Sequence, residues 1–205
     1  ERHAARRDGV RDRLTELGVD ALVVTYPANV TYLTGFTGSN GAVVVSAAPG
    51  LDRLATDFRY VTQAAAECPG LEVLVERDVV AALVAYAVGG GAGRLGFESH
   101  DWRVSAYESV RGAHRDLDLV ATSGVVEALR TVKDDDEIAA LAQACRISDD
   151  ALAALLPEVL VGMTERALAR RLEWLMLELG ASAVSFESIV AGGPHSAIPH
   201  HSPTD

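Results

Sequence analysis

The chain has 205 residues, of which 49% are hydrophobic and 23% charged, and its formal net charge is −11. This composition is typical of a globular protein of one or two domains and excludes a disordered or fibrous chain, while the negative charge argues against nucleic-acid and anionic-lipid partners. No apolar run approaches the ~18 residues of a membrane span. The two cysteines, Cys68 and Cys145, match no metal or redox spacing, and this cysteine usage favours a reducing, cytoplasmic location.

The first 130 residues alternate between helical and strand-like patterns. Val10, Leu14 and Leu17 have helical spacing, and Gly18 is placed to end that helix. Short apolar runs predict strands, and periodic segments between them predict further helices. The predicted strands are Ala21–Thr25, Ala42–Ser46, Arg53–Thr56, Leu71–Val75, Arg94–Phe97 and Leu117–Ala121, and the predicted helices are Tyr60–Glu67, Val79–Val88 and Val104–His114. The alternation predicts an α/β architecture with helices packed over a sheet.

Three features of this part have a functional and an ordinary interpretation, and the ordinary one is favoured. The segment Gly91–Gly96 has dinucleotide-binding glycine spacing, but it follows a helix and precedes a strand, the reverse of the required order. Gly38–Gly41 lacks the glycine that a nucleophile elbow needs two residues before its serine, and predicts a tight turn whose residues tolerate positive φ. Asp57 and Arg59 are interpreted as an ion pair rather than a binding patch.

The charge balance changes near residue 130, which predicts a domain boundary there. Residues 1–130 carry 13 basic and 17 acidic groups, whereas residues 131–205 carry 5 and 12. Asp134 and Glu137 have the spacing of a capping box, so a long helix is predicted from there towards Leu156. Part of the negative charge in this region therefore caps a helix.

A second helix is predicted from Thr164 to Gly180, with Leu168, Leu172, Leu175 and Leu179 on one face. The run Ala183–Ala191 predicts a strand, and a loop rich in Gly, Pro and His follows. That loop places His195, His200, His201 and Asp205 within eleven residues. Such a group could bind a metal or transfer protons, or its members could be solvated surface residues. The spacing fits neither a helical His pair nor a His-x-His strand site, so the choice stays open.

Several segments, in order, resemble Xaa-Pro aminopeptidases, prolidases and creatinase. The segments Asn29–Asn40 and Thr56–Tyr60 resemble the N-terminal domain of that family, and Arg130–Ile138 resembles the entry helix of its pita-bread catalytic domain. Gly162–Glu165 and Ser185–His201 resemble the first part of that catalytic domain. The resemblance implies a creatinase-like, ribonuclease-H-like mixed-sheet domain over residues 1–130 and an incomplete α+β pita-bread domain over residues 131–205.

The function implied by the resemblance is that of a homodimeric peptidase that removes an N-terminal residue preceding proline. Family members use two divalent ions (Mn, Co or Zn), held by two Asp, one His and two Glu. By the resemblance, all five ligands lie beyond Asp205, so we expect this chain to be the N-terminal part of a longer enzyme. On that basis it binds no metal by itself and has no peptidase activity alone. Proline-containing peptides are the implied substrates, and the N-terminal domain is the implied dimer contact.

One active-site residue carries over from the family: His200, the first His of the Pro-His pair, is expected to contact the substrate or the tetrahedral intermediate. His201 matches a variable position, and His195 stands where the family often has Asn, so their roles stay open. Two alternatives also stay open. One is a non-catalytic dimerisation or interaction module of the same fold, and the other is a metal-free, creatinase-type C–N hydrolase.

Overall fold

The computed structural model describes residues 1–205 and divides into two compact units, Glu1–Val132 and Lys133–Asp205. No helix in the chain combines the length and the apolar character that crossing a membrane requires.

The first unit is built on a six-stranded mixed sheet of order β4-β3-β2-β1-β5-β6. β1 pairs in parallel with β5 and β5 with β6, β3 pairs in parallel with β4, and β2 lies antiparallel to both β1 and β3. The strands are β1 (Ala21–Val24), β2 (Gly41–Ser46), β3 (Arg53–Thr56), β4 (Glu72–Val75), β5 (Arg94–Glu98) and β6 (Asp118–Thr122). The six strands predicted for this unit are confirmed within one or two residues, because each is a largely apolar run bounded by turn residues.

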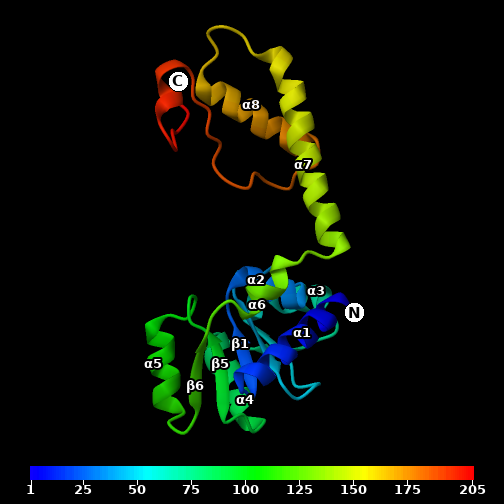
Figure 1. Ribbon diagram of the computed structural model, residues 1–205, viewed down its shortest axis with the longest axis vertical. Coiled ribbons are helices and arrows are strands. Elements are labelled where there is room, and N and C mark those ends of the chain that lie inside the picture. Colours follow the sequence, from blue (N-terminus) through cyan, green and yellow to red (C-terminus); the bar gives the residue numbers. More distant parts are fainter. The chain divides into compact units, whose positions relative to one another are not determined.

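Helices cover both faces of this sheet, as Figure 1 shows. Because side chains alternate along a strand, Leu22 and Val24 of β1 enter one hydrophobic core, and Ala21 and Val23 enter the other. The first core is closed by α1 (Arg2–Leu17), α2 (Pro27–Thr34), α3 (Val61–Glu67) and α6 (Val125–Thr131), and the second by α4 (Val79–Gly89) and α5 (Val104–Ala113). The mixed α/β fold class predicted from the sequence is confirmed.

Two helices, α2 and α6, were not predicted, because both are too short to show a clear helical period. α2 has Pro27 at its first turn and ends at Gly35, whose φ is 85°. Proline at the start and glycine just past the end are the usual helix boundaries, so a signal for α2 was present. The predicted end of α1 is confirmed, since Gly18 has φ 63° and closes that helix.

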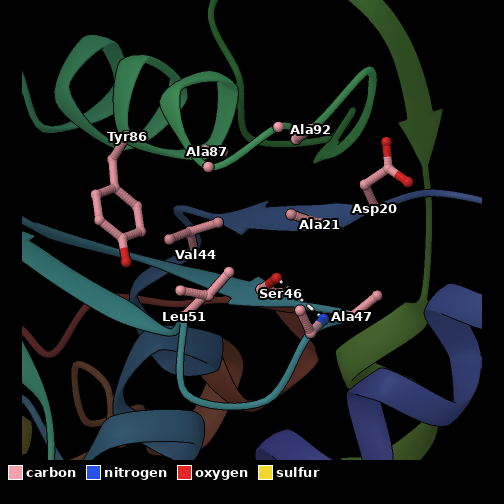
Figure 2. Close-up of a pocket in the computed structure, with 12 residues that line it drawn as sticks. Asp20, Ala21, Val44, Ser46, Ala47, Leu51, Tyr86, Ala87 and Ala92 are labelled. Atoms are coloured by element: carbon pink, nitrogen blue, oxygen red, sulfur yellow. Dashed lines mark hydrogen bonds between the residues drawn. The ribbon is translucent and has the colours of Figure 1, made fainter.

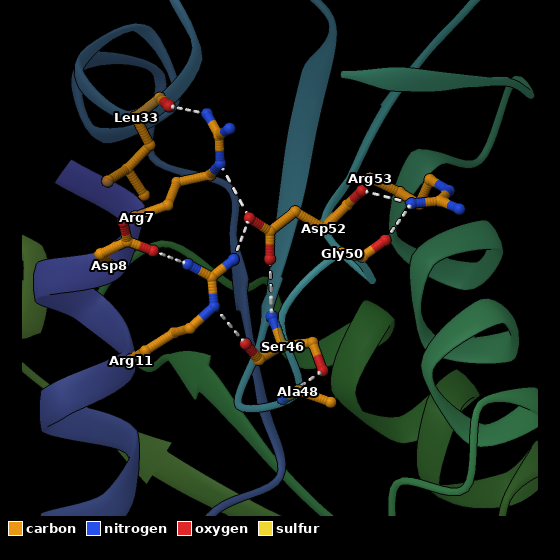
Figure 3. Close-up of polar contacts among 9 residues, drawn as sticks. All are labelled: Arg7, Asp8, Arg11, Leu33, Ser46, Ala48, Gly50, Asp52 and Arg53. Carbon is orange, nitrogen blue, oxygen red and sulfur yellow. Dashed lines mark hydrogen bonds and ion pairs between the residues drawn. The ribbon is translucent and has the colours of Figure 1, made fainter. Parts of the chain in front are cut away.

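A buried ionic network fastens α1 to the β2–β3 connection (Figure 3). Arg7 Nε donates to Asp52 Oδ2 at 2.8 Å, and the guanidinium of Arg11 reaches the same oxygen. The other Asp52 oxygen accepts from the backbone N–H of Ser46, while a second guanidinium nitrogen of Arg7 donates to the Leu33 carbonyl. One carboxylate therefore links α1 to the connection between two central strands.

Close packing, not positive φ, explains the glycines of the Gly38–Gly41 turn. Neither Gly38 nor Gly41 has positive φ, so the prediction that this turn requires residues tolerant of positive φ is wrong. A Cβ at Gly38 would lie 2.3 Å from Cζ of the buried Phe36 ring, and one at Gly41 would lie 2.5 Å from Cε1 of the same ring. The turn folds over the face of Phe36, which is itself held edge-on against Tyr60.

Gly38→Ala is accordingly expected to lower the free energy of unfolding by about 1–3 kcal/mol, because the new methyl group overpacks a core ring. Urea unfolding of the whole chain measures the change. Gly112→Ala is the matched control, since a Cβ at this position in α5 would meet nothing within 4 Å. That variant should be neutral or up to ~1 kcal/mol more stable. Equal effects of the two substitutions would contradict the packing argument.

The second unit consists mainly of α7 (Asp135–Leu155) and α8 (Glu165–Glu178). The predicted capping box is confirmed: the Asp134 side chain accepts from the Glu137 N–H, and the Glu137 side chain accepts from the Asp134 N–H. The core between the two helices is small, with Ala151, Leu155 and Leu175 buried. Three single-turn 3-10 helices complete the chain, η1 (Phe58–Tyr60) in the first unit and η2 (Leu156–Glu158) and η3 (Gly193–Ala197) in the second.

The strand predicted over Ala183–Ala191 is not formed. A strand is stable only when its backbone groups pair with a neighbouring strand, and this unit contains no strand to pair with. The apolar alternation of the segment therefore leaves Phe186 and Ile189 exposed.

Candidate functional site

His200 lies at a cavity of about 1090 Å³ in the second unit. One side of the cavity is formed by α8 and the other by the segments around residues 184–189 and 200–203. The lining includes the charged side chains Arg166, Arg170, Glu173 and Glu187. His200 is exposed, has φ 58°, and is the only non-glycine residue of the chain with positive φ. Its imidazole is thus open to a molecule that enters the cavity.

Beside this cavity, the carboxylate of Glu165 is the centre of a hydrogen-bond cluster at the first residue of α8. Its Oε1 accepts from the Gly192 N–H at 2.7 Å and contacts His195 Nδ1 at 2.9 Å. Its Oε2 contacts His201 Nε2 at 2.7 Å and accepts from the backbone N–H and the hydroxyl of Thr204 at 3.0 and 2.9 Å. The loop 192–204 is therefore bound at both of its ends by one side chain.

Two of the three predicted loop histidines come together, and the third does not. The rings of His195 and His201 lie with their centroids 4.4 Å apart and their planes tilted by 31°, and both contact Glu165. His200 lies between them in sequence but makes no hydrogen bond to this cluster. Asp205, the fourth member of the predicted group, instead pairs with Arg166 at 3.2 Å. Glu165 belongs to the Gly162–Glu165 segment that resembles the family, but no pattern in the sequence indicated its contacts with this loop.

Hydrogen bonding lowers the pKa of Glu165 well below its ordinary value of about 4.5, with the Gly192 N–H as the largest cause, followed by His201 and Thr204. A carboxylate whose pKa falls on folding stabilises the fold above its unfolded pKa, and this contribution disappears as pH drops through the lower folded value. The Glu165 contacts should therefore persist through pH 4.5.

The measurement for this prediction is exchange of the Gly192 and Thr204 amide protons as a function of pH. Both amides should stay protected while ordinary glutamates become protonated, and lose protection only in stronger acid. Glu165→Gln is the control, because it should remove the protection at every pH. Loss of protection centred on pH 4.5 in the unaltered chain would contradict the prediction.

A second polar cluster lies in the first unit, where β1 and β5 end. Glu98 is 4% exposed, and its carboxylate accepts from the N–H groups of Thr25 and Tyr26, which precede α2. The Asn29 amide donates to both Glu98 and Glu127 at 2.6 Å. Burial is the largest cause of the raised pKa of Glu98. A glutamate at the end of an apolar strand was the sequence signal for this cluster, and it was missed.

Neither cluster fits a two-metal centre. Glu165, His195 and His201 form one group whose ligand atoms lie within 4.8 Å of one another, and Glu98, His100 and Glu127 form another. A dinuclear site needs carboxylates that bridge two ions. Both oxygens of Glu165 are already occupied by hydrogen-bond donors, and the Asn29 amide bonds to both glutamates of the other group. In this structure, hydrogen bonds therefore hold the carboxylates of both groups in place.

Further cavities lie in the first unit, and two of them include residues of β2 in their lining. One, of about 700 Å³, is at the edge where β1 and β5 end and includes Asn40, Asp101 and Trp102 in its lining. The other, of about 230 Å³, lies between α4 and strands β1 and β2, and Figure 2 shows Tyr86 facing Val44 and Leu51 across it. In the lining of the larger cavity, the Thr25 hydroxyl donates to the Asp101 carboxylate at 2.6 Å, whereas the smaller cavity is lined mainly by apolar residues.

The ordinary interpretations of the other motifs are confirmed. Arg59 donates to both oxygens of Asp57, at 2.9 and 2.7 Å, and this ion pair lowers the pKa of Asp57. Gly91 follows α4 with φ 93° and leads directly into β5, as expected for a turn after a helix. The Gly38–Gly41 turn holds Ser39 against the Tyr60 hydroxyl at 2.6 Å rather than against a base.

Comparison with known proteins places matches along nearly the whole chain. The profile of the Creatinase/Prolidase N-terminal domain matches residues 6–132, and that of metallopeptidase family M24 matches residues 139–205. The uncharacterized peptidase YqhT of Bacillus subtilis is 38% identical over 194 residues, which cover 93% of this chain and 54% of that protein. The chain spans about half the length of these curated relatives, which include an Xaa-Pro dipeptidase of Pyrococcus furiosus.

Solved structures of peptidases also match this chain. The Xaa-Pro dipeptidase from Bacillus anthracis matches with a TM-score of 0.90 and 32% identity, over 98% of this chain and 56% of that one. The N-terminal domain of the cytoplasmic peptidase PepQ from Mycobacterium tuberculosis matches with a TM-score of 0.59 and 45% identity, over 61% of this chain and 98% of that one. The first unit therefore corresponds to a domain that has been solved by itself in another protein.

Proposed function

The chain belongs to the creatinase/prolidase family, whose N-terminal portion it spans, and on that premise we propose that it is the N-terminal part of a peptidase that cleaves the bond between an N-terminal residue and a following proline. The observation that supports this most is the order of the two matches, which together run from residue 6 to residue 205. Relatives named Xaa-Pro dipeptidase match over the same range.

In the proposed enzyme, the metal ligands are residues outside this chain. M24 enzymes are metallopeptidases, and the two Glu–His groups present here do not fit a dinuclear site. The proposal therefore assigns the ligands of two divalent ions (Mn, Co or Zn) to the part of the enzyme that follows residue 205, and assigns no metal to this chain alone. It follows that the 205-residue chain has no peptidase activity by itself.

Within this chain, the proposal gives one residue a direct role in the reaction. His200 is exposed at the 1090 Å³ cavity, and its imidazole makes no hydrogen bond to another side chain. An imidazole in that position can donate a hydrogen bond to the substrate carbonyl or to the tetrahedral intermediate. The same lining contains Arg170, together with Arg166, which pairs with Asp205, and Glu173, which accepts from the Ser188 hydroxyl.

The proposed enzyme has two domains in this part of its chain, forms a homodimer and acts in the cytoplasm. The proposal assigns residues 1–130 to a creatinase-like domain and residues 131–205 to the first part of a pita-bread peptidase domain. It places the contact of a homodimer on the N-terminal domain, and the enzyme in the cytoplasm, where proline-containing peptides are the substrates.

The test is a peptidase assay on the full-length protein that carries these residues. Release of the N-terminal residue from Ala-Pro and from Ala-Pro-x peptides should require added Mn²⁺, Co²⁺ or Zn²⁺ and should stop with a chelator. The 205-residue chain, assayed in parallel, should be inactive. Metal-independent hydrolysis of creatine would favour a creatinase-type enzyme instead, and dimerisation without hydrolysis of either substrate would favour an interaction module.

A further inference from the structure

We propose that Glu165 is the positioning residue of the site: it fixes the loop 192–204 and thereby sets the place of the His200 imidazole. This inference rests on the proposed function, because it gives Glu165 an effect on catalysis through His200. It adds a residue on another element, 35 positions earlier in the chain, that does not touch the substrate.

The first argument is the distribution of the bonds along the loop. Gly192 and His195 contact Glu165 on the N-terminal side of His200, and His201 and Thr204 contact it on the C-terminal side. A carboxylate that receives a charge-assisted bond from each side of a residue defines where that residue lies. His201, the immediate neighbour of His200, has a side chain only 10% exposed, so its ring is packed as well as hydrogen-bonded.

The second argument is the backbone of His200 itself. A non-glycine residue in the left-handed region is energetically unfavourable and persists where the surrounding structure determines it. The His200 side chain has no hydrogen bond that could supply this restraint. The restraint must therefore come through the neighbours of His200, and their polar contacts converge on Glu165.

A third argument concerns the rigidity of the support. Glu165 is the first residue of α8, and the N-cap Thr164 accepts from the Ala167 N–H at 3.1 Å, which fixes the helix start. The next residue, Arg166, donates its backbone N–H to the Thr204 carbonyl at 3.0 Å. The loop is thus attached to a helix end rather than to another loop, as a precisely placed functional group requires.

The test is a double-mutant cycle in the full-length enzyme with Ala-Pro as substrate. Glu165→Gln should lower kcat roughly 10- to 100-fold, in the range seen when a supporting hydrogen bond of a site is removed. The double variant Glu165→Gln/His200→Ala should have the kcat of His200→Ala alone, because a positioning residue has no effect once the residue it positions is absent. KM should change less than kcat.

The control is Glu158→Gln. Glu158 is paired through two 2.6 Å bonds to Arg171 in the same unit and lies outside the cavity, so this variant should keep wild-type kcat. Should Glu165→Gln fail to fold, Thr204→Val removes only the hydroxyl bond and should give a smaller loss with the same masking by His200→Ala. The inference is overturned by an unchanged kcat in Glu165→Gln, by an equal further loss in the His200→Ala background, or by a His200→Ala variant with normal kcat.

Amide exchange separates this inference from the proposed function. In the 205-residue chain, Glu165→Gln should remove the protection of the Gly192 and Thr204 amides and leave the first unit unchanged. If the full-length protein cleaves no Xaa-Pro peptide, the proposed function fails. Amide exchange still measures whether Glu165 fixes the loop 192–204. Unchanged protection of these amides in Glu165→Gln overturns the inference that Glu165 fixes the loop. Stoichiometric Zn²⁺ binding to the 205-residue chain that is abolished by His201→Ala also overturns it.

Discussion

Asp52→Ala is expected to lower the free energy of unfolding by about 3–5 kcal/mol, the effect of removing one partner from a buried ionic network. The Asp52 side chain is 7% exposed and that of Arg7 is 9% exposed, so the substitution leaves a guanidinium without its counter-charge in a dry environment. It also removes the acceptor for the Ser46 N–H. Urea unfolding of the whole chain, followed by a signal from the first unit, measures the loss.

Asp8→Ala is the matched control for this prediction. Asp8 pairs with Arg11 of the same network, but its side chain is 70% exposed, and exposed ion pairs contribute about 0–1 kcal/mol. Asp52→Asn should be intermediate, because the amide keeps one acceptor but not the charge. If Asp52→Ala and Asp8→Ala destabilised the protein equally, the network would not be the link between α1 and the β2–β3 connection.

His200→Ala in the full-length enzyme is expected to lower kcat roughly 10²-fold with a smaller change in KM, as for loss of one hydrogen bond to developing negative charge. The expectation depends on two features of His200, its exposure at the large cavity and its unpaired imidazole. His114→Ala, at the end of α5 in the other unit, should leave kcat unchanged. A normal kcat in His200→Ala would remove this residue from the reaction.

Hydrophobic alternation and capping signals predicted most of the fold. Strand positions such as Ala21–Val24 are apolar on both faces, which is typical of a strand covered by helices on both sides. The capping box at Asp134 predicted the start of α7 to the residue. These features are local, since each depends on residues within a few positions of one another.

What the sequence could not predict depends on contacts that exist only in the folded chain, whether the residues are close together in the sequence or far apart. Gly38 is required by the ring of Phe36, which folds back beneath the turn, and no pattern in the sequence indicates that contact. The segment 183–191 has the alternation of a strand, but strand formation depends on a partner. Glu165 meets the loop 27 to 39 residues later, so its role became visible only in three dimensions.

The order of strands in the sheet has a consequence for synthesis on the ribosome. β1 has an entirely apolar sequence, Ala21–Val24, and β5, its partner on one side, begins only at Arg94. While the intervening residues are being translated, α1 and the β1–β2–β3 meander can assemble, but one edge of β1 stays unpaired. An apolar open edge is a template for aggregation. We expect nascent chains that stop before residue 94 to depend on chaperones, and those that extend past β5 to be released from them.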